Sequence, residues 1–185
     1  MDASKSPFAF RDTDKLLKAT SVNHGATIFP YYVKNPSDFG VVEFNEDGLV
    51  TRIEEKPTNP KSNFAVTGLY FYDNDVIEIA KSILPSKRNE LEITDINNAY
   101  IDRGKLFVQM LGRGFAWLDT GTPDSLMEAG TFIQTIEHRQ GLKVACLEEI
   151  AFNNKWIDKE AISSNAKKLS NTTYGKYLKD LIDKD

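Results

Sequence analysis

Residues 64–72 read FAVTGLYFY, a run without a charged side chain in which apolar and aromatic residues occupy both sets of alternating positions. A strand covered on both faces of a sheet has this pattern, whereas a strand with one wet face alternates apolar with polar residues. Asp73 follows, and apolar residues then recur at helical spacing from Val76 to Ile83. The stretch therefore predicts a central strand, covered on both sides, that leads into a helix capped by Asp73.

The segments before this strand predict further strands of the same sheet. Residues 40–55 indicate a hairpin, because Asp47-Gly48 supplies the positive φ that a tight turn between two strands needs. Residues 27–33 have strand composition, with Pro30 predicting an edge position or a bulge. A short helix over about 12–20 is expected before them.

The segments after it alternate between helix and strand. We expect a helix from Thr94 or Asp95 to Asp102 that ends at Gly104, followed by strands over 105–111 and 115–118. Further helices are predicted from the N-cap Thr122 to Gly141, after the N-cap Asp158, and over 174–182. Alternating strands and helices with one polar hairpin predict an α/β fold, a mixed sheet layered by helices.

Composition narrows the function classes. The 185 residues are 41% hydrophobic and carry a net charge of −4, which is typical of a folded domain and gives no general basic face for nucleic acid or anionic membrane. No apolar run approaches the roughly 20 residues of a membrane span, and the N-terminus does not resemble a secretory signal. Cys146 is the only cysteine, so an internal disulfide is excluded and a cytoplasmic location is expected.

Several common catalytic motifs are absent from the sequence. It holds no G-x-x-x-x-G-K-[ST], G-x-G-x-x-G, G-x-S-x-G or H-E-x-x-H pattern. His24 and His138 lie far apart without metal-ligand spacing, so two solvated histidines are the expected reading.

Three places could carry chemistry. Glu54-Glu55-Lys56-Pro57 ends a predicted strand, where Lys56 could hold a phosphate and Glu55 could accept hydrogen bonds from sugar hydroxyls, with Glu54 and Lys56 on one face. Asp119 follows a predicted strand and precedes a helix N-terminus, a position that suits Mg²⁺ and phosphate. Arg88 lies in a loop, and its guanidinium could bind a phosphate through two N–H groups. The alternative is that Glu54, Glu55, Lys56 and Arg88 are ordinary exposed charges and that Asp119 is an ordinary turn residue.

The longer motifs give a resemblance. They closely resemble the sugar nucleotidyltransferase family, and within it the glucose-1-phosphate thymidylyltransferases, from about Asp14 to the C-terminus. The matching segments are FGVVEF at 39–44, EEKP at 54–57, NFAVTGLYFYD at 63–73, ELEITD at 90–95 and GRGFAWLDTGT at 112–122.

The resemblance implies a fold, a reaction and a division of the chain. The fold is part of a doubly wound mixed sheet of the Rossmann-like nucleotidyltransferase type. The reaction is transfer of a thymidylyl group from dTTP to glucose 1-phosphate with Mg²⁺, giving dTDP-glucose and pyrophosphate for deoxysugar and rhamnose pathways in a homotetramer. The implied parts are an unmatched segment 1–13, a sugar-phosphate-binding part 14–141 and a helical region 142–185.

The resemblance also assigns residues. Lys56, Arg88 and Asp119 are the implied catalytic residues, with Asp119 as one of two family Mg²⁺ carboxylates. The implied sugar-phosphate contacts are Gly40, Glu55, Lys56, Val66, Thr67 and Gly68. A regulatory nucleotide site between subunits is implied for Arg113, Glu149 and Ile150.

One family feature is missing. The glycine-rich nucleotide loop G-G-x-G-T-R-L is not in the sequence, and neither is the first metal aspartate of the family. We therefore expect a C-terminal fragment of the enzyme with little or no transferase activity alone. The alternatives are a uridylyltransferase of the same family, a non-catalytic module that binds sugar nucleotide or joins subunits, and a purely structural α/β domain.

Overall fold

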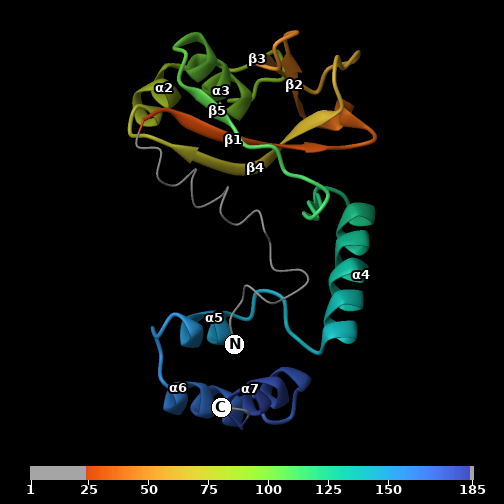
Figure 1. The fold of residues 1–185 in the computed structure, drawn as a ribbon, viewed down its shortest axis with the longest axis vertical. Coiled ribbons are helices and arrows are strands. Elements are labelled where there is room, and N and C mark those ends of the chain that lie inside the picture. The colour runs from red at the N-terminus through yellow and green to blue at the C-terminus, as the bar shows by residue number, and fades with distance from the viewer. Residues whose placement is uncertain (1–23, 184–185) are drawn as a thin grey trace. The chain divides into compact units, whose positions relative to one another are not determined.

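The structure is a computed structural model that describes residues 24–183 (Figure 1). The expected helix over 12–20 lies outside these residues. Contacts within the chain separate two compact units, Met1–Trp117 and Leu118–Asp185, which are described here one at a time. Within the described part of the chain, no helix is both long and apolar enough to span a bilayer.

The first unit is built on a mixed five-stranded sheet with strand order β3-β2-β4-β1-β5. The strands are β1 (Ala26–Tyr32), β2 (Gly40–Phe44), β3 (Val50–Glu55), β4 (Phe64–Tyr72) and β5 (Leu106–Val108). β5 runs parallel to β1, and the other pairs are antiparallel. The predicted hairpin and the central place of β4 are confirmed, as is the mixed α/β class.

Pro30 interrupts the ladder between β1 and β4. The register shifts between Ile28 and Pro30, because proline has no N–H to give to the ladder. β1 lies between two strands, so the bulge, and not an edge position, is what Pro30 marks.

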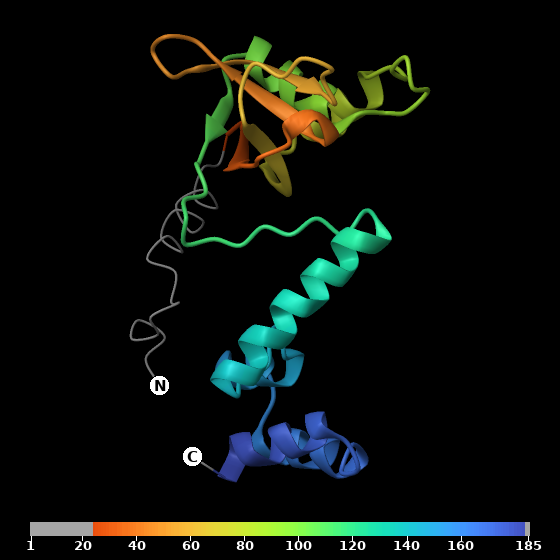
Figure 2. The same cartoon turned by 90° about the vertical axis from the view of Figure 1, so that its right-hand side faces the viewer.

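Helices α2 (Val76–Ser82) and α3 (Ile93–Asp102) lie together on one side of the sheet (Figures 1 and 2). Ile79 of α2 and the α3 residues Ile96 and Tyr100 pack against Ala26 of β1 in one buried cluster. The predicted cap was wrong in one respect. The N-cap of α2 is Asp75, and the Asp73 carboxylate instead accepts hydrogen bonds from other groups, the Tyr100 hydroxyl among them.

Two further expectations are wrong. Gly68 and Leu69 are exposed, so β4 is not covered on both faces along its whole length. Residues 115–118 do not form a strand, because the chain turns at Gly112–Phe115 and no strand of the described chain pairs with the segment that follows. Asp119 therefore does not stand at the tip of a strand.

The second unit is helical. It contains α4 (Pro123–Gln140), α5 (Leu147–Asn153), α6 (Lys159–Lys168) and α7 (Thr173–Asp183). The predicted ends of α4 are confirmed, with Thr122 in a capping box at its start and Gly141 in the left-handed conformation at its end. Asp158 caps α6 as expected. A small core of Cys146, Ile162, Ala166, Leu178 and Ile182 joins α6 and α7.

Candidate functional site

The end of the β2–β3 hairpin brings Gly40 and Glu55 together. The two residues are direct cross-strand partners, so their Cα substituents are on the same face of the sheet. A Cβ added to Gly40 would lie 3.2 Å from Glu55 Oε2 and 3.2 Å from Thr94 Oγ1. Glycine therefore allows the Glu55 carboxylate and the α3 hydroxyl to close over the strand. In this contact, Thr94 Oγ1 donates to Glu55 Oε2 at 2.6 Å.

Lys56 leaves the strand in a left-handed conformation. Its φ is 45°, and its N–H donates to the carbonyl of Phe39 at 3.0 Å, which closes the base of the hairpin. The strand ends at Glu55, so strand alternation does not extend to Lys56 and does not support the expectation that Lys56 shares a face with Glu54. The Lys56 side chain is exposed, and its ammonium forms no ion pair with any residue between 24 and 183.

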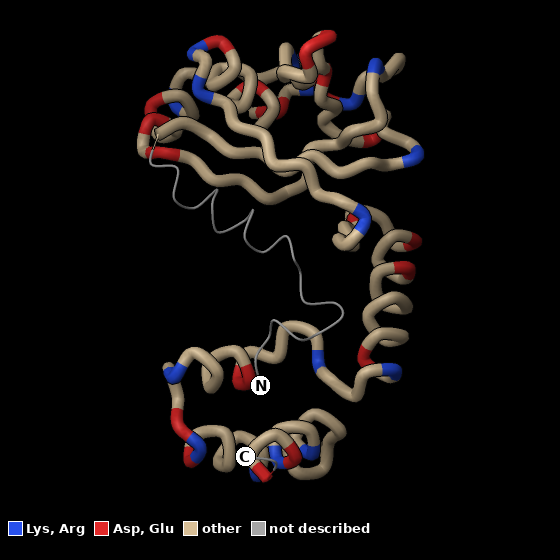
Figure 3. Tube along the Cα trace, viewed as in Figure 1, with Lys and Arg blue, Asp and Glu red and all other residues tan. Residues whose placement is uncertain are grey.

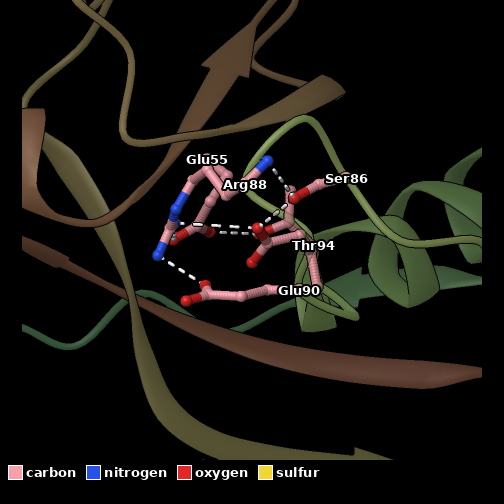
Figure 4. Close-up of polar contacts among 6 residues, drawn as sticks. Glu55, Ser86, Arg88, Glu90 and Thr94 are labelled. Carbon is pink, nitrogen blue, oxygen red and sulfur yellow. Dashed lines mark hydrogen bonds and ion pairs between the residues drawn. The ribbon is translucent and has the colours of Figure 1, made fainter.

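Arg88 lies in the loop between α2 and α3, as the sequence predicted, and its guanidinium lies among three carboxylates. It donates to Glu90 at 2.5 Å and approaches Glu55 at 3.6 Å and Glu92 at 3.7 Å. Figure 4 shows Arg88 beside Glu55 and Glu90, together with Ser86 and Thr94. The loop is braced by Ser86, whose hydroxyl donates to Glu92 at 2.8 Å and accepts from the Arg88 N–H at 3.1 Å.

The charge of this cluster is negative. Three carboxylates face one guanidinium, and Lys56, whose ammonium has no ion-pair partner among residues 24–183, is next in sequence to Glu55. Burial, and then the negative charge of Glu55, raise the pKa of Tyr70 above its ordinary value, so this neighbouring hydroxyl stays protonated. The cluster offers carboxylate acceptors for hydroxyl groups. A phosphate can bind the Arg88 guanidinium only by replacing one of the glutamates that contact it.

The predicted sugar contacts on β4 are mostly inside the sheet. Val66 is buried in the cluster with Val42 and Ile53. Thr67 is buried as well, and its hydroxyl donates to the carbonyl of Phe29 at 2.9 Å. Gly68 is exposed, with no atom within 4 Å of an added Cβ. Their roles in substrate binding stay predictions.

Asp119 belongs to the second unit and is exposed. Its Oδ2 accepts from the Gly121 N–H at 3.2 Å, and its other oxygen has no hydrogen-bond partner within the described chain. No group of three or more His, Cys, Asp and Glu residues that could hold a metal occurs among residues 24–183. Asp119 therefore fits Mg²⁺ only as a single carboxylate beside ligand phosphates, which is a usual way of holding this ion.

The predicted regulatory residues are divided between the two units. Arg113 is exposed in the first unit, and Ile150 is 42% exposed on α5 of the second. Glu149, also on α5, accepts a hydrogen bond from the Tyr177 hydroxyl of α7. Desolvation, followed by that bond, raises the pKa of Tyr177 above its ordinary value.

Sequence reasoning missed the residues that support the cluster. Thr94 was interpreted only as a helix start, and Asn98 was not singled out, although its side-chain amide bonds the backbone of Ile53. A polar residue at i and another at i+4 on a helix of apolar spacing share one face, and this spacing could have indicated that both point to the sheet.

Comparison with known proteins finds a match between residues 6–136 and the family described as nucleotidyl transferase. Curated relatives named glucose-1-phosphate thymidylyltransferase include one from Neisseria gonorrhoeae, 55% identical over 93% of this chain and 60% of its own length. Another, from Mycobacterium tuberculosis strain H37Rv, is 53% identical over 87% of this chain and 56% of its own length. The chain thus spans less than two thirds of the relatives it matches.

Two solved structures of nucleotidyltransferases are also similar to this chain. A putative glucose-1-phosphate thymidylyltransferase from Bacillus anthracis, solved with sucrose, matches with a TM-score of 0.58 and 40% identity over 65% of this chain and 48% of that one. A UDP-glucose pyrophosphorylase bound to UDP-glucose matches with a TM-score of 0.55 and 24% identity over 69% of this chain and 49% of that one. The second likeness concerns the fold alone.

Proposed function

The chain belongs to the nucleotidyl transferase family, and we propose that its protein transfers a thymidylyl group from dTTP to glucose 1-phosphate. The observation that supports this most directly is the cluster at the end of β3. There Gly40, Glu55 and Arg88 come together from separate segments, in a chain 55% identical to a named thymidylyltransferase. Glu55 accepts hydrogen bonds from sugar hydroxyls, and Lys56 and Arg88 hold the phosphate.

In this reaction, an oxygen of the sugar phosphate attacks the α-phosphorus of dTTP in line. The bond between the α-phosphorus and the bridging oxygen breaks, and its electron pair leaves with pyrophosphate. A phosphate nucleophile is already anionic at neutral pH, so the work of Lys56 and Arg88 is to position it and to neutralise its charge. Asp119 and the phosphates would hold Mg²⁺, which would supply further charge neutralisation.

Arg88 has to change partners for this role. It is held by Glu90 in the present structure, and a sugar phosphate carries more charge than one carboxylate and offers a bidentate contact. Binding of the phosphate therefore moves the guanidinium from Glu90 to the ligand, while Glu55 stays anchored by Thr94.

The wider setting follows from the same assignment. We place the reaction in the cytoplasm and its product in dTDP-rhamnose and deoxysugar synthesis, in a homotetramer. Arg113, Glu149 and Ile150 belong to a regulatory nucleotide site of that assembly. The sequence contains no G-G-x-G-T-R-L loop, so for the chain by itself we propose binding of the sugar phosphate without turnover.

Calorimetric titration with glucose 1-phosphate tests the proposal. We expect binding to the wild-type chain, and Lys56→Gln and Arg88→Gln each weaken it by about tenfold or more, because each removes a charged hydrogen bond. Lys61→Gln is the matched control, since Lys61 is an exposed cation that pairs with Glu43. Equal affinity in all four proteins contradicts the proposed site.

A second measurement separates the alternatives. Stronger binding of dTDP-glucose than of UDP-glucose supports the thymidylyl reading, and the reverse order supports the uridylyl one. Pyrophosphate release from dTTP and glucose 1-phosphate at a steady rate shows that the chain turns over alone. Absence of binding to every one of these ligands leaves only a structural role.

A further inference from the structure

The strand that ends at Glu55, directly before Lys56, is an edge strand among residues 24–183. Within the described part of the chain, β3 is the outermost strand of the sheet and pairs only with β2. In an antiparallel ladder, every second residue of an edge strand directs its N–H and C=O away from the sheet. Such a strand can fray or slide, and this would displace the two residues at its end.

Asn98 of α3 forms hydrogen bonds with the outward N–H and C=O of one β3 residue, Ile53. Its Oδ1 accepts from the Ile53 N–H at 2.9 Å, and its Nδ2 donates to the Ile53 carbonyl at 2.9 Å. The side-chain amide thus bonds Ile53 as a neighbouring strand would, through one donor and one acceptor. The partner of Ile53 on β2 is Val42, and the Ile53 side chain is buried, so this residue is fixed from both sides.

The same face of α3 contacts β3 at a second position, through Thr94. Thr94 lies one turn before Asn98, and its hydroxyl binds the Glu55 carboxylate at 2.6 Å. Ile53 and Glu55 are one strand repeat apart, so α3 holds the backbone at the first residue and the side chain at the second. Lys56 follows directly, in a left-handed conformation.

We propose that Asn98 is a positioning residue for sugar-phosphate binding, because its amide anchors β3 and thereby sets Glu55 and Lys56 toward the ligand. This inference rests on the proposed function. Asn98 itself does not touch the ligand in this account, and it acts through the backbone of Ile53.

Two substitutions remove the anchor in different ways. Asn98→Ala deletes both hydrogen bonds. Asn98→Asp keeps the size and the acceptor for the Ile53 N–H, but it turns the donor into an oxygen that faces the Ile53 carbonyl. Ile101→Val is the control for stability, because it removes a methylene of α3 from the same core without touching the anchor.

Amide hydrogen exchange and glucose 1-phosphate titration are measured on the isotope-labelled full chain. In both Asn98 variants we expect exchange at the Ile53 amide to rise about tenfold and the dissociation constant for glucose 1-phosphate to rise by a similar factor. The Ile101→Val chain keeps the wild-type dissociation constant, although its melting temperature falls.

Two results overturn the inference. One is unchanged exchange at Ile53 in the Asn98→Ala chain, which means that the amide does not hold the strand. The other is faster exchange with unchanged affinity, which makes the anchor purely structural. A wild-type chain that does not bind glucose 1-phosphate refutes the proposed function, and the positioning role falls with it, whereas the exchange rates still report whether the anchor exists.

Discussion

Replacing Tyr100 by Phe should destabilise the first unit in a pH-dependent way. The Tyr100 ring is fully buried, and its hydroxyl donates to Asp73 Oδ1 at 2.6 Å. Phenylalanine keeps the ring and removes only this bond. A hydrogen bond to a charged group contributes about 1.5–3 kcal/mol, and the lower end applies because Asp73 is partly exposed and water can replace the donor. We expect the free energy of unfolding to fall by about 1.5 kcal/mol.

The sign of the pH dependence follows from Asp73. The Tyr100 hydroxyl, then the N–H groups of Gly25 and Asp75, hold the pKa of the Asp73 carboxyl below its ordinary value. A depressed folded-state pKa stabilises the fold above the unfolded value of about 3.9, and this stability is lost as pH falls through the folded pKa. Tyr100→Phe raises the folded pKa, so the variant loses less stability on acidification than the wild type does.

Denaturant unfolding at pH 7 and at pH 3 measures both effects. The difference in unfolding free energy between wild type and Tyr100→Phe should be largest at pH 7 and narrow toward pH 3. Tyr70→Phe is the matched control, because Tyr70 is a half-buried tyrosine that stacks on Tyr72 and its hydroxyl has no hydrogen-bond partner in the described chain. An equal loss at both pH values would refute the role of the Asp73 charge.

Three smaller tests concern the helices of the second unit, each read from Tm and denaturant unfolding. Gly175→Ala places a Cβ 2.1 Å from the Leu169 carbonyl oxygen and should destabilise by about 2–3 kcal/mol, and an unaffected Tm contradicts the close approach. Gly130→Ala, with nothing within 4 Å, should stabilise α4 by about 0.5–1 kcal/mol, and destabilisation would be the contrary result. Asp158→Ala removes the hydrogen bond that caps the Ala161 N–H and should lower the free energy of unfolding by about 1 kcal/mol. An unchanged free energy of unfolding would show that the cap does not contribute to stability.

Local backbone chemistry made some elements predictable from the sequence. Gly48 and Gly141 both adopt positive φ, one in the hairpin turn and one at the end of α4, as their positions required. Thr122 and Asp158 cap helices because their side chains can accept backbone N–H groups within three residues. Each of these features depends on a few neighbours in sequence, so pattern alone was sufficient.

The features that depend on distant partners were not predictable. Residues 115–118 have strand composition, yet a strand needs a neighbour to take its hydrogen bonds, and composition does not supply one. Asp73 was expected to cap the next helix, but besides the nearby Asp75 N–H its carboxylate accepts from the Tyr100 hydroxyl, 27 residues away, and from the distant Gly25 N–H. The three glutamates around Arg88 are separated in sequence by up to 37 residues, so their convergence is a consequence of the fold.

That convergence bears directly on how an anion could bind. A free Arg88 would attract phosphate from a distance, but a guanidinium among Glu55, Glu90 and Glu92 is already compensated, and the surplus negative charge repels anions. Figure 3 shows acidic and basic residues mixed over the described residues of the first unit, 24–117, and these residues provide no broad positive field that offsets this repulsion. Binding then depends on the exchange of Glu90 for the ligand. Glu90→Gln weakens the competing contact without removing a proposed ligand, so it should tighten glucose 1-phosphate binding severalfold. Weaker binding in that variant would mean that Glu90 orients Arg88 for the ligand instead of competing with it.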